Sequence, residues 1–326
     1  MVAIVESILA RMAVTLILGA TIVASTLGAW FRRLFFLADA TATGRPIDIV
    51  IIGTFYNDGW FQSHVKPLIE CRNIGRIHIV TDQPLAQHDK VCYHCPSRTT
   101  RKGLGRTIAR LLVLIRLARK QRLALLMGYH IMPNALMALV IARWFWLRAA
   151  YQMTGGPIQL IGGGVGSENR LLRRQAVSSR LREALMFAIV RRFDSIIVRG
   201  ESSRRFIREV APNVQCDIIP GSIDTDKFNE SPADKTYDTI AVGRLVDVKR
   251  YDRMLNILAE FKQHRPSFRA AIVGDGPLSA RLRVQSITLG IDANVDFLGQ
   301  RNDVPELLTS ARLFLLTSEN EDSQSR

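Results

Sequence analysis

Acidic residues and cysteines are both scarce in this chain of 326 residues. The four cysteines, Cys71, Cys92, Cys95 and Cys216, are too few for a disulfide scaffold and favour a reduced, cytoplasmic setting. Asp and Glu together number 29 against 44 Lys and Arg, which gives a formal net charge of +15. This excess of positive charge predicts an anionic partner, which could be a phosphate group, a nucleic acid or an acidic membrane face.

Three motifs that would assign a function at once are incomplete. The segment Cys92-Tyr93-His94-Cys95 has metal-like spacing, but no second Cys/His pair accompanies it, so ordinary thiols are favoured over a metal site. The glycine-rich segment 162–166 does not match G-x-G-x-x-G, which disfavours a nicotinamide dehydrogenase and leaves open a close approach of backbone to another ligand. Neither a nucleic-acid-binding module nor an interleaved aromatic platform is present, so we expect no nucleic-acid partner.

Residues 12–31 carry no charged side chain, and this run of twenty is long enough to cross a bilayer as a helix. Arg32 and Arg33 follow directly, so the positive-inside rule places the bulk of the chain in the cytoplasm and the N-terminus outside. A cleaved signal peptide is disfavoured by the long apolar core. A helix resting on the membrane or against the protein stays open, because glycine, threonine and serine dilute the run. We expect a single-pass or interfacial anchor over residues 1–45, at the cytoplasmic face of the membrane.

The chain then enters a strand, glycine loop, helix, strand order that is typical of a doubly wound sheet. Residues 47–52 predict a buried strand that ends at Gly53, and residues 54–59 predict a loop. The following helix carries His64 and Val65. Further strands are predicted at 77–80, 123–127, 159–161 and 195–198, and further helices at 100–122, 134–151, 170–192 and 202–210. The arginine-rich helices among them suit a solvated face or an anionic lipid surface. Residues 216–220 end this half of the chain.

The same rhythm restarts after a polar segment, 229–235, that reads as a hinge. Strands are predicted near 239–242, 270–273, 295–298 and 313–316, and helices at 251–264, 278–289 and 304–311. The sequence ends soon after the last of these strands, so the second domain is expected to be incomplete. We therefore expect an anchor and linker over 1–45, a first Rossmann-like domain over 46–220 and a second over 221–326.

Residues 239–251 organise the second domain. Gly243 ends the strand, Arg244 follows at its carboxyl end, and Lys249 lies at the start of the next helix. Ligands bind at this edge in open α/β sheets, and two fixed cations beside a helix N-terminus suit a diphosphate. A solvated loop that happens to carry basic residues is the alternative.

Several spaced motifs make the chain similar to the GT-B glycosyltransferases of glycosyltransferase family 4. The resemblance is dense over about 216–321 and loose before it, where only the Gly59 loop, His64-Val65 and His130 align. The matching segments of the second domain are 218–228, Gly243-Arg244 with Lys249, 272–277, 296–300 and 315–321.

The resemblance implies an α/β fold of two Rossmann-like domains and transfer of a sugar, with retention, from a UDP- or GDP-sugar to a hydroxyl acceptor. The acceptor is expected to be a lipid-linked glycan or polysaccharide precursor at an anionic membrane surface. Arg244 and Lys249 are expected to stabilise the departing diphosphate without a metal or another cofactor. Gly243 is expected beside the diphosphate with this pair, and Gly274, Asp275, Gly276 and Pro277 are expected at the nucleoside. Gly59 is expected at the sugar phosphate, and His130 at the sugar or acceptor, unless that histidine is structural.

One departure from the family pattern concerns its E-x7-E motif. The first glutamate best matches Glu321, with Glu319 as the alternative, and the second would fall beyond Arg326. The resemblance therefore also allows a fragment, or a truncated and inactive protein that only binds a membrane or a partner.

Overall fold

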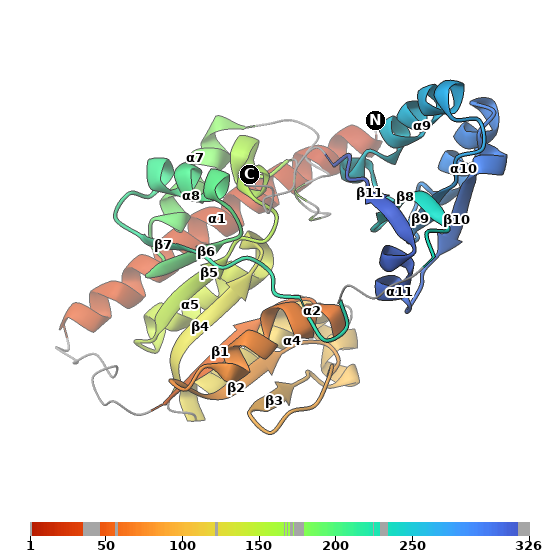
Figure 1. Ribbon diagram of the computed structural model, residues 1–326. Coiled ribbons are helices and arrows are strands. Elements are labelled where there is room, and N and C mark those ends of the chain that lie inside the picture. The colour runs from red at the N-terminus through yellow and green to blue at the C-terminus, as the bar shows by residue number, and fades with distance from the viewer. Residues whose placement is uncertain are drawn as a thin grey trace. The chain divides into compact units, whose positions relative to one another are not determined.

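The computed structural model describes residues 2–34, 46–55, 58–120, 123–165, 179–223, 225–228 and 234–318, and residues 167, 169 and 172. The chain divides into unit 1, which includes Met1–Ser222, and unit 2, Ile223–Glu321. Each unit is built on a parallel sheet with helices packed against it (Figure 1). Two parallel-sheet α/β domains and an N-terminal apolar helix were predicted from the sequence, and both predictions are confirmed.

Unit 1 contains a seven-stranded sheet in the order β3-β2-β1-β4-β5-β6-β7. Its strands are β1 (Ile47–Ile52), β2 (Ile74–Val80), β3 (Val91–His94), β4 (Leu123–Tyr129), β5 (Arg148–Gln152), β6 (Ser195–Val198) and β7 (Gln215–Ile218). Its α-helices are α1 (Val2–Leu34), α2 (Asp58–His64), α3 (Lys66–Glu70), α4 (Arg98–Lys120), α5 (Leu136–Trp144), α7 (Arg180–Val190) and α8 (Glu201–Val210). Short turns of helix lie at Ile131–Ala135, Pro157–Gln159 and Ile161–Gly163.

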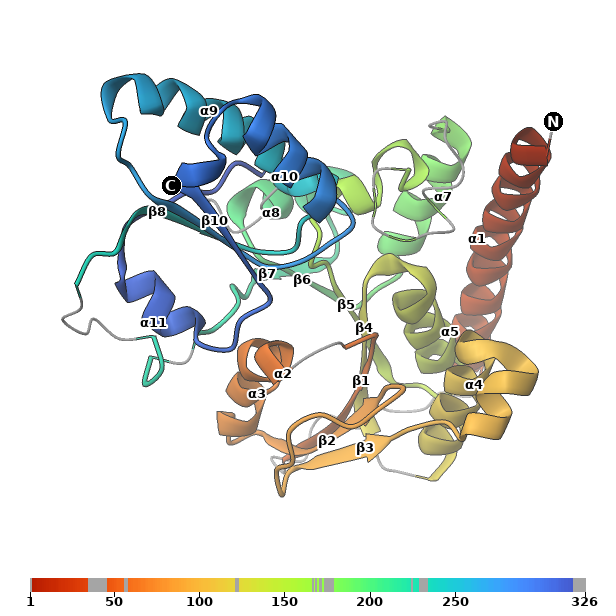
Figure 2. The same cartoon turned by 90° about the vertical axis from the view of Figure 1, so that its right-hand side faces the viewer.

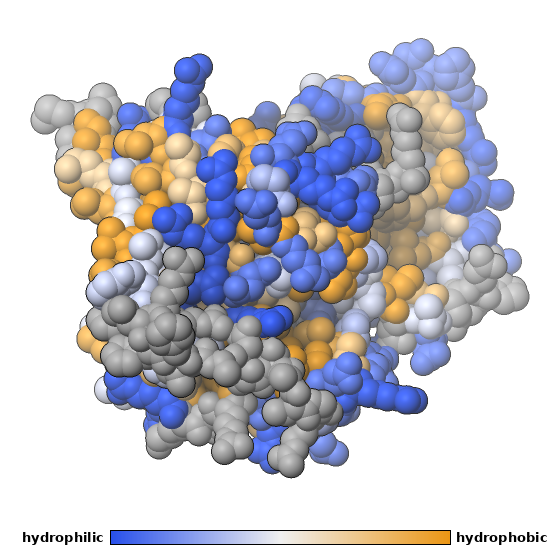
Figure 3. Space-filling view, turned by 90° about the vertical axis from the view of Figure 1, so that its left-hand side faces the viewer, coloured by the Kyte–Doolittle hydropathy of each residue, from blue (hydrophilic) through white to orange (hydrophobic). Residues whose placement is uncertain are grey.

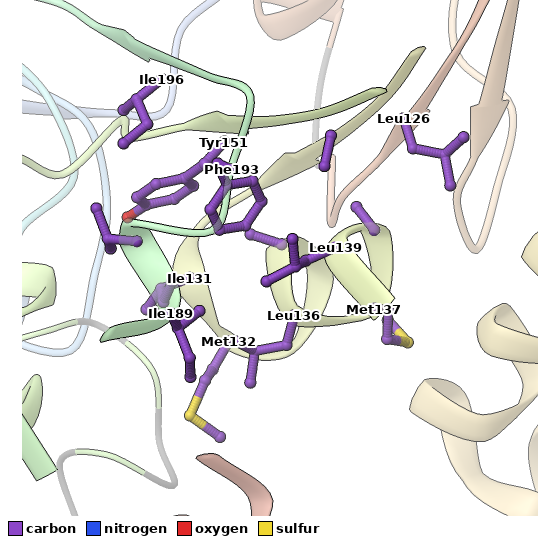
Figure 4. Packing of buried hydrophobic residues seen from close by; sticks show 14 of the residues in the cluster. Leu126, Ile131, Met132, Leu136, Met137, Leu139, Tyr151, Ile189, Phe193 and Ile196 are labelled. Carbon is purple, nitrogen blue, oxygen red and sulfur yellow. The ribbon is translucent and has the colours of Figure 1, made fainter. Parts of the chain in front are cut away.

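Burial on both faces explains why β1 reads as an unbroken apolar run. Val50 and Ile52 pack into the cluster that holds α4, α5, α7 and α8, whereas Ile49 and Ile51 pack against α2 and α3. Successive side chains of a strand point to opposite faces, so a strand covered on both sides needs apolar residues at every position. In the larger cluster, the rings of Tyr151 and Phe193 lie side by side with centroids 5.6 Å apart (Figure 4).

Helix α1 is an additional layer outside α5 and α7. Val14 and Leu18 are fully buried in the same cluster as α5 and α7, and Figure 2 shows α1 at the outer edge of unit 1 with α5 beside it. Trp144 at the end of α5 donates its indole N–H to the Ala24 carbonyl at 3.1 Å. The N-terminal helix is therefore packed against the protein along one face.

Unit 2 contains a four-stranded parallel sheet in the order β10-β9-β8-β11. Its strands are β8 (Tyr237–Val242), β9 (Ala270–Val273), β10 (Val295–Gly299) and β11 (Ala311–Phe314). Its helices are α9 (Tyr251–His264), α10 (Ser279–Thr288) and α11 (Val304–Thr309), with short turns of helix at Asp247–Lys249 and Asp292–Asn294. Ala270 and Ile272 face the α9 and α10 cluster, whereas Ala271 and Val273 face the cluster that includes α11 residues.

Two elements predicted for unit 1 are wrong. The predicted helix 134–151 ends at Trp144, and Arg148–Gln152 form the buried strand β5. The predicted strand 159–161 instead lies in two short 3-10 helices. The local sequence could not have prevented the first error, because Ala149 and Ala150 are good helix formers. They adopt strand geometry because β5 pairs with β4 on one side and β6 on the other.

Candidate functional site

In each sheet, candidate residues lie beyond the carboxyl ends of the strands, at the point where the strand order reverses. In unit 2, β8 pairs with β9 on one side and β11 on the other, so the strand order reverses between β8 and β11. In unit 1 the order reverses between β1 and β4. Open α/β sheets bind ligands at such switch points, beyond the carboxyl ends of the strands. Gly243 and Arg244 follow β8, and His130 follows β4.

The loop after β8 is held by direct backbone contact with the loop after β9. Leu245 N–H donates to the Asp275 carbonyl at 3.0 Å, and Leu278 N–H donates to the Leu245 carbonyl at 3.2 Å. A Cβ on Gly274 would lie 2.0 Å from the Gly243 oxygen, and one on Gly276 would lie 2.4 Å from the Leu245 oxygen. These two glycines are therefore required by the packing of the loops, as well as leaving backbone open to a ligand.

Arg244 and Lys249 bring two cations to this edge of unit 2. Arg244 is exposed, and its guanidinium makes no hydrogen bond or ion pair within the described part of the chain. The Lys249 side chain folds back toward β8, because its Cε lies 3.8 Å from the position of a Cβ on Gly243. With the N-terminus of α9 beginning at Tyr251, the loop offers an anion two side-chain charges and a helix dipole.

The segment after β11 is hydrogen-bonded to the turn that precedes α9, at the same edge of the sheet. Thr317 Oγ1 donates to the carbonyls of Lys249 and Arg250, each at 3.0 Å, and so fixes the turn that carries Lys249. The next hydroxyl, on Ser318, is buried and has no hydrogen-bond partner among the residues that the structure describes. Sequence reasoning selected the glutamates of this motif and missed both hydroxyl residues, although they stand directly before Glu319.

The remaining site residues predicted in unit 2 are Asp275 and Pro277, which the structure describes, and two glutamates, which it does not. Asp275 and Pro277 are exposed, and the Asp275 carboxylate accepts from the Gly276 N–H at 2.7 Å. Glu321 and Glu319, the two candidates for the first glutamate of the E-x7-E motif, lie outside the described residues.

In unit 1, Gln159 and Thr154 both lie within hydrogen-bond distance of His130 Nδ1. The Thr154 Oγ1 is 3.2 Å from this nitrogen. Gln159 Nε2 lies 3.1 Å from His130 Nδ1, and Gln159 Oε1 accepts from the Tyr151 hydroxyl at 2.7 Å. Because Gln159 uses its oxygen toward Tyr151, its amide donates to Nδ1, which places the imidazole proton on Nε2. His130 itself has φ of 60°, a left-handed conformation that non-glycine residues adopt at a cost. Gln159 and Tyr151 are both buried, so this orientation is built into the core of unit 1.

A second histidine, His64, lies in an aromatic cluster at the same end of unit 1. Its ring stacks on Trp60 and meets Tyr129 edge-on, and its Nε2 accepts from the Arg199 guanidinium. Burial, followed by the charges of Arg199 and His130, lowers the pKa of His64 from 6.5 to about 4. His64 is therefore neutral at physiological pH and acts as a hydrogen-bond acceptor.

The position of Gly59 differs from the prediction. The loop was expected to run through Gly59, but α2 begins at Asp58, which places Gly59 in the first helical turn. Its carbonyl accepts from the Ser63 hydroxyl at 2.9 Å. Gly59 is exposed, so it can still approach a ligand, although as part of a helix.

The low pKa of His64 predicts that unit 1 loses stability in acid. Between pH 6.5 and about 4 the unfolded chain binds a proton at His64 that the folded chain does not, so stability falls as pH falls through this window. The expected loss is at most about 3 kcal/mol, because solvent reduces the effect of a partly exposed group. Urea unfolding at pH 7, 5 and 4 measures it. His64→Gln keeps an acceptor for Arg199 and should unfold with a flatter pH dependence, whereas an unchanged slope would refute this assignment.

Comparisons with known proteins bear on the family and on the fold. Residues 222–323 match the family model described as glycosyl transferases group 1. The putative glycosyltransferase EpsF of Bacillus subtilis (strain 168) is 26% identical over 133 residues, which cover 36% of this chain and 35% of EpsF. The match thus spans about a third of that relative's length.

Two solved structures share the fold. The crystal structure of Anabaena Alr3699/HepE in complex with UDP and glucose has a TM-score of 0.61 at 17% identity, over 85% of this chain and 75% of that chain. The crystal structure of WaaG, a glycosyltransferase involved in lipopolysaccharide biosynthesis, has a TM-score of 0.55 at 16% identity, over 84% and 75%. These likenesses show two parallel-sheet α/β domains of the GT-B type.

Proposed function

We propose that this chain, which carries a glycosyl transferases group 1 domain in unit 2, transfers a sugar from a nucleoside-diphosphate donor to a hydroxyl acceptor with retention at the anomeric carbon. The observation that carries the proposal is the loop after β8, where exposed Arg244 and inward-folded Lys249 stand at the switch point of the sheet. The family match of this unit supports the donor class, as does the UDP bound in the crystal structure of HepE.

In this proposal the loop stabilises the leaving group. The bond between the anomeric carbon and the diphosphate oxygen breaks, and the electron pair stays on that oxygen. Arg244 and Lys249 offset the growing negative charge, a role that metal ions fill in other transferases. The acceptor hydroxyl oxygen forms the new bond to the anomeric carbon on the same face, and its proton passes to the departing oxygen. Added chelator is therefore expected to leave turnover unchanged.

The nucleoside is proposed to lie against Gly274–Pro277, and Glu319 or Glu321 to contact the donor sugar. His130 is proposed to donate its Nε2–H to a hydroxyl or phosphate oxygen of the substrate, because Gln159 already occupies Nδ1. Gly59 lies at the same end of unit 1 and is proposed to face the sugar phosphate.

The acceptor is proposed to be a lipid-linked glycan or polysaccharide precursor at the cytoplasmic face of an anionic membrane. Helix α1 supports this, because residues 8–30 are long and apolar enough to cross a membrane and much of that surface is not covered by protein. The arginine-rich composition of the chain supports an anionic lipid surface as well.

Incubating the full chain with UDP- and GDP-sugars and a membrane lipid extract tests the proposal. Donor consumption that depends on the extract, with a glycosylated product, is expected for at least one pair. Nucleotide binding without transfer for any pair would favour the alternative of an inactive protein that only binds, and no nucleotide binding would refute the donor site.

The hydrogen bond from Gln159 to His130 predicts a positioning effect on turnover. Gln159→Glu replaces a donor with a carboxylate that only accepts, which moves the imidazole proton to Nδ1 and away from the substrate. A loss in kcat of about tenfold is expected with little change in KM. Nitrogen chemical shifts of His130 report the tautomer directly.

Tyr151→Phe is the matched variant, because it removes the hydroxyl that orients Gln159 while keeping the ring volume. It should lower kcat in the same direction and by less. If the tautomer shifts in Gln159→Glu while kcat does not change, His130 is structural.

A further inference from the structure

One side of α1 consists of large apolar side chains that the protein leaves uncovered. Leu16 is 69% exposed and Val23 is 60% exposed. The members of this outer face are Leu9, Met12, Leu16, Val23, Leu27 and Trp30, all of which are exposed. At 3.6 residues per turn they fall within an arc of about 60° that runs for about 30 Å. Figure 3, which views the molecule from the left-hand side of Figure 1, shows apolar groups at the surface along its left edge and elsewhere between charged residues.

The opposite side of α1 is fixed to unit 1 along its length. Its buried residues are Ala10, Val14, Leu18, Thr21, Ser25 and Gly28. A Cβ on Gly28 would lie 2.9 Å from the backbone of Arg143, so the helix approaches α5 closely at that point. Small and hydroxyl-bearing residues thus face the protein, whereas the largest apolar residues face away from it.

This arrangement conflicts with a membrane-spanning helix. If α1 crossed a bilayer in its packed position, α5 and the end of α7 would lie at the depth of the hydrocarbon. That region includes the ion pair between Arg143 and Asp194, whose nitrogen and oxygen are 2.9 Å apart, and ionised side chains are costly at that depth. Spanning would therefore require α1 to leave unit 1 and expose Val14 and Leu18.

The residues that flank the outer face suit a membrane surface. Half-exposed Trp144 reaches Ala24 on one flank, and the Arg192 guanidinium lies 3.4 Å from the Thr26 hydroxyl on the other. Trp30 belongs to the outer face itself. Tryptophan and arginine concentrate at the level of lipid headgroups, where indole rings and guanidinium groups meet water and phosphate.

We propose that α1 lies in the plane of an anionic membrane, with its outer face at the boundary between headgroups and acyl chains and both of its ends on the side of unit 1. This inference deepens and rests on the membrane association proposed above. It places the N-terminus on the same side as the rest of the chain, whereas the charge rule applied to the sequence predicts the opposite side.

Vesicle flotation of the full chain tests the surface. Binding to vesicles of phosphatidylcholine and phosphatidylglycerol is expected, with weaker binding to phosphatidylcholine alone. The double variant Leu16→Glu, Val23→Glu should bind at least about tenfold more weakly. Val284→Glu is the control, because Val284 on α10 is 63% exposed and lies in unit 2. Equal binding by the double variant and the control would overturn the proposal, as would a concentration-dependent dimer that the double variant alone abolishes.

The side of the N-terminus distinguishes a surface helix from a span. A protease-cleavable tag before Met1 should be protected in intact expressing cells and cleaved in lysed cells, together with a tag at the C-terminus. Cleavage of the N-terminal tag alone in intact cells would overturn the in-plane orientation and leave membrane association standing. Failure to bind any vesicle would refute membrane association, and it would leave the transferase reaction untouched.

Discussion

Arg244→Ala is expected to weaken binding of UDP or GDP by about thirtyfold, which corresponds to about 2 kcal/mol. Arg244 is exposed at the carboxyl end of β8, and its guanidinium makes no hydrogen bond or ion pair with the residues that the structure describes, so the variant should fold normally. A charged hydrogen bond to a phosphate oxygen is the contact removed. Titration calorimetry with each nucleotide measures the change.

Arg265→Ala is the matched control for this experiment. It removes the same charge from the same unit, but Arg265 lies beyond the end of α9 and pairs with Asp238, near the amino ends of the strands. Its nucleotide affinity should be unchanged. If both variants bind with wild-type affinity, the diphosphate does not lie on the loop after β8.

Gly274→Ala is expected to destabilise unit 2 by roughly 3 kcal/mol or more and to abolish nucleotide binding. Gly274 has φ of 135°, and a Cβ there would lie 2.0 Å from the Gly243 oxygen, which is backbone and cannot rotate away. The two loops must therefore separate, which displaces Arg244. Urea unfolding and calorimetry measure the two effects.

Gly290→Ala separates conformational strain from the clash. Gly290 also has a positive φ, 65°, but a Cβ there meets nothing within 4 Å. This control should cost about 1 kcal/mol and leave nucleotide binding intact. Equal losses in the two variants would show that the contact with Gly243 does not matter.

The parts of the fold that sequence patterns predicted are those where local pattern and burial agree. β1 is apolar at nearly every position because it is central and covered on both faces, and α9 repeats its apolar residues at helical spacing toward a single cluster. The loop between β8 and α9 was predictable for the same reason, since a glycine separates two clear patterns.

The elements that were missed depend on partners distant in the sequence. Arg148–Gln152 contains the helix-forming pair Ala149-Ala150, and only the space between β4 and β6 makes it a strand. No strand was predicted at β3, where ordinary thiols were favoured over a metal site, and it pairs along β2 and brings His94 Nε2 within 2.9 Å of His78 Nδ1. Glycines 162–164 all have positive φ, and a Cβ on Gly164 would lie 2.8 Å from the Gln159 oxygen, so they serve a tight turn.

The residues of the candidate site divide in the same way, into those that local patterns predict and those that depend on distant partners. Arg244 and Lys249 could be chosen from spacing alone, whereas Thr317 could not, because its role is to hold the carbonyls of a turn 67 and 68 residues earlier. Gln159 could not be chosen from the sequence either, because only the packing of the core brings it to His130. The faces of α1 were also hidden, because every residue of 12–31 is uncharged and only packing separates the inner from the outer side.

The central claim is that the loop after β8 holds the diphosphate of the donor, and a crystal structure of the full chain with UDP tests it most directly. The account predicts diphosphate oxygens within about 3.2 Å of the Arg244 guanidinium and the Lys249 ammonium, with the base beside Gly274–Pro277. A nucleotide bound elsewhere on the chain, with Arg244 pointing into solvent, would contradict it.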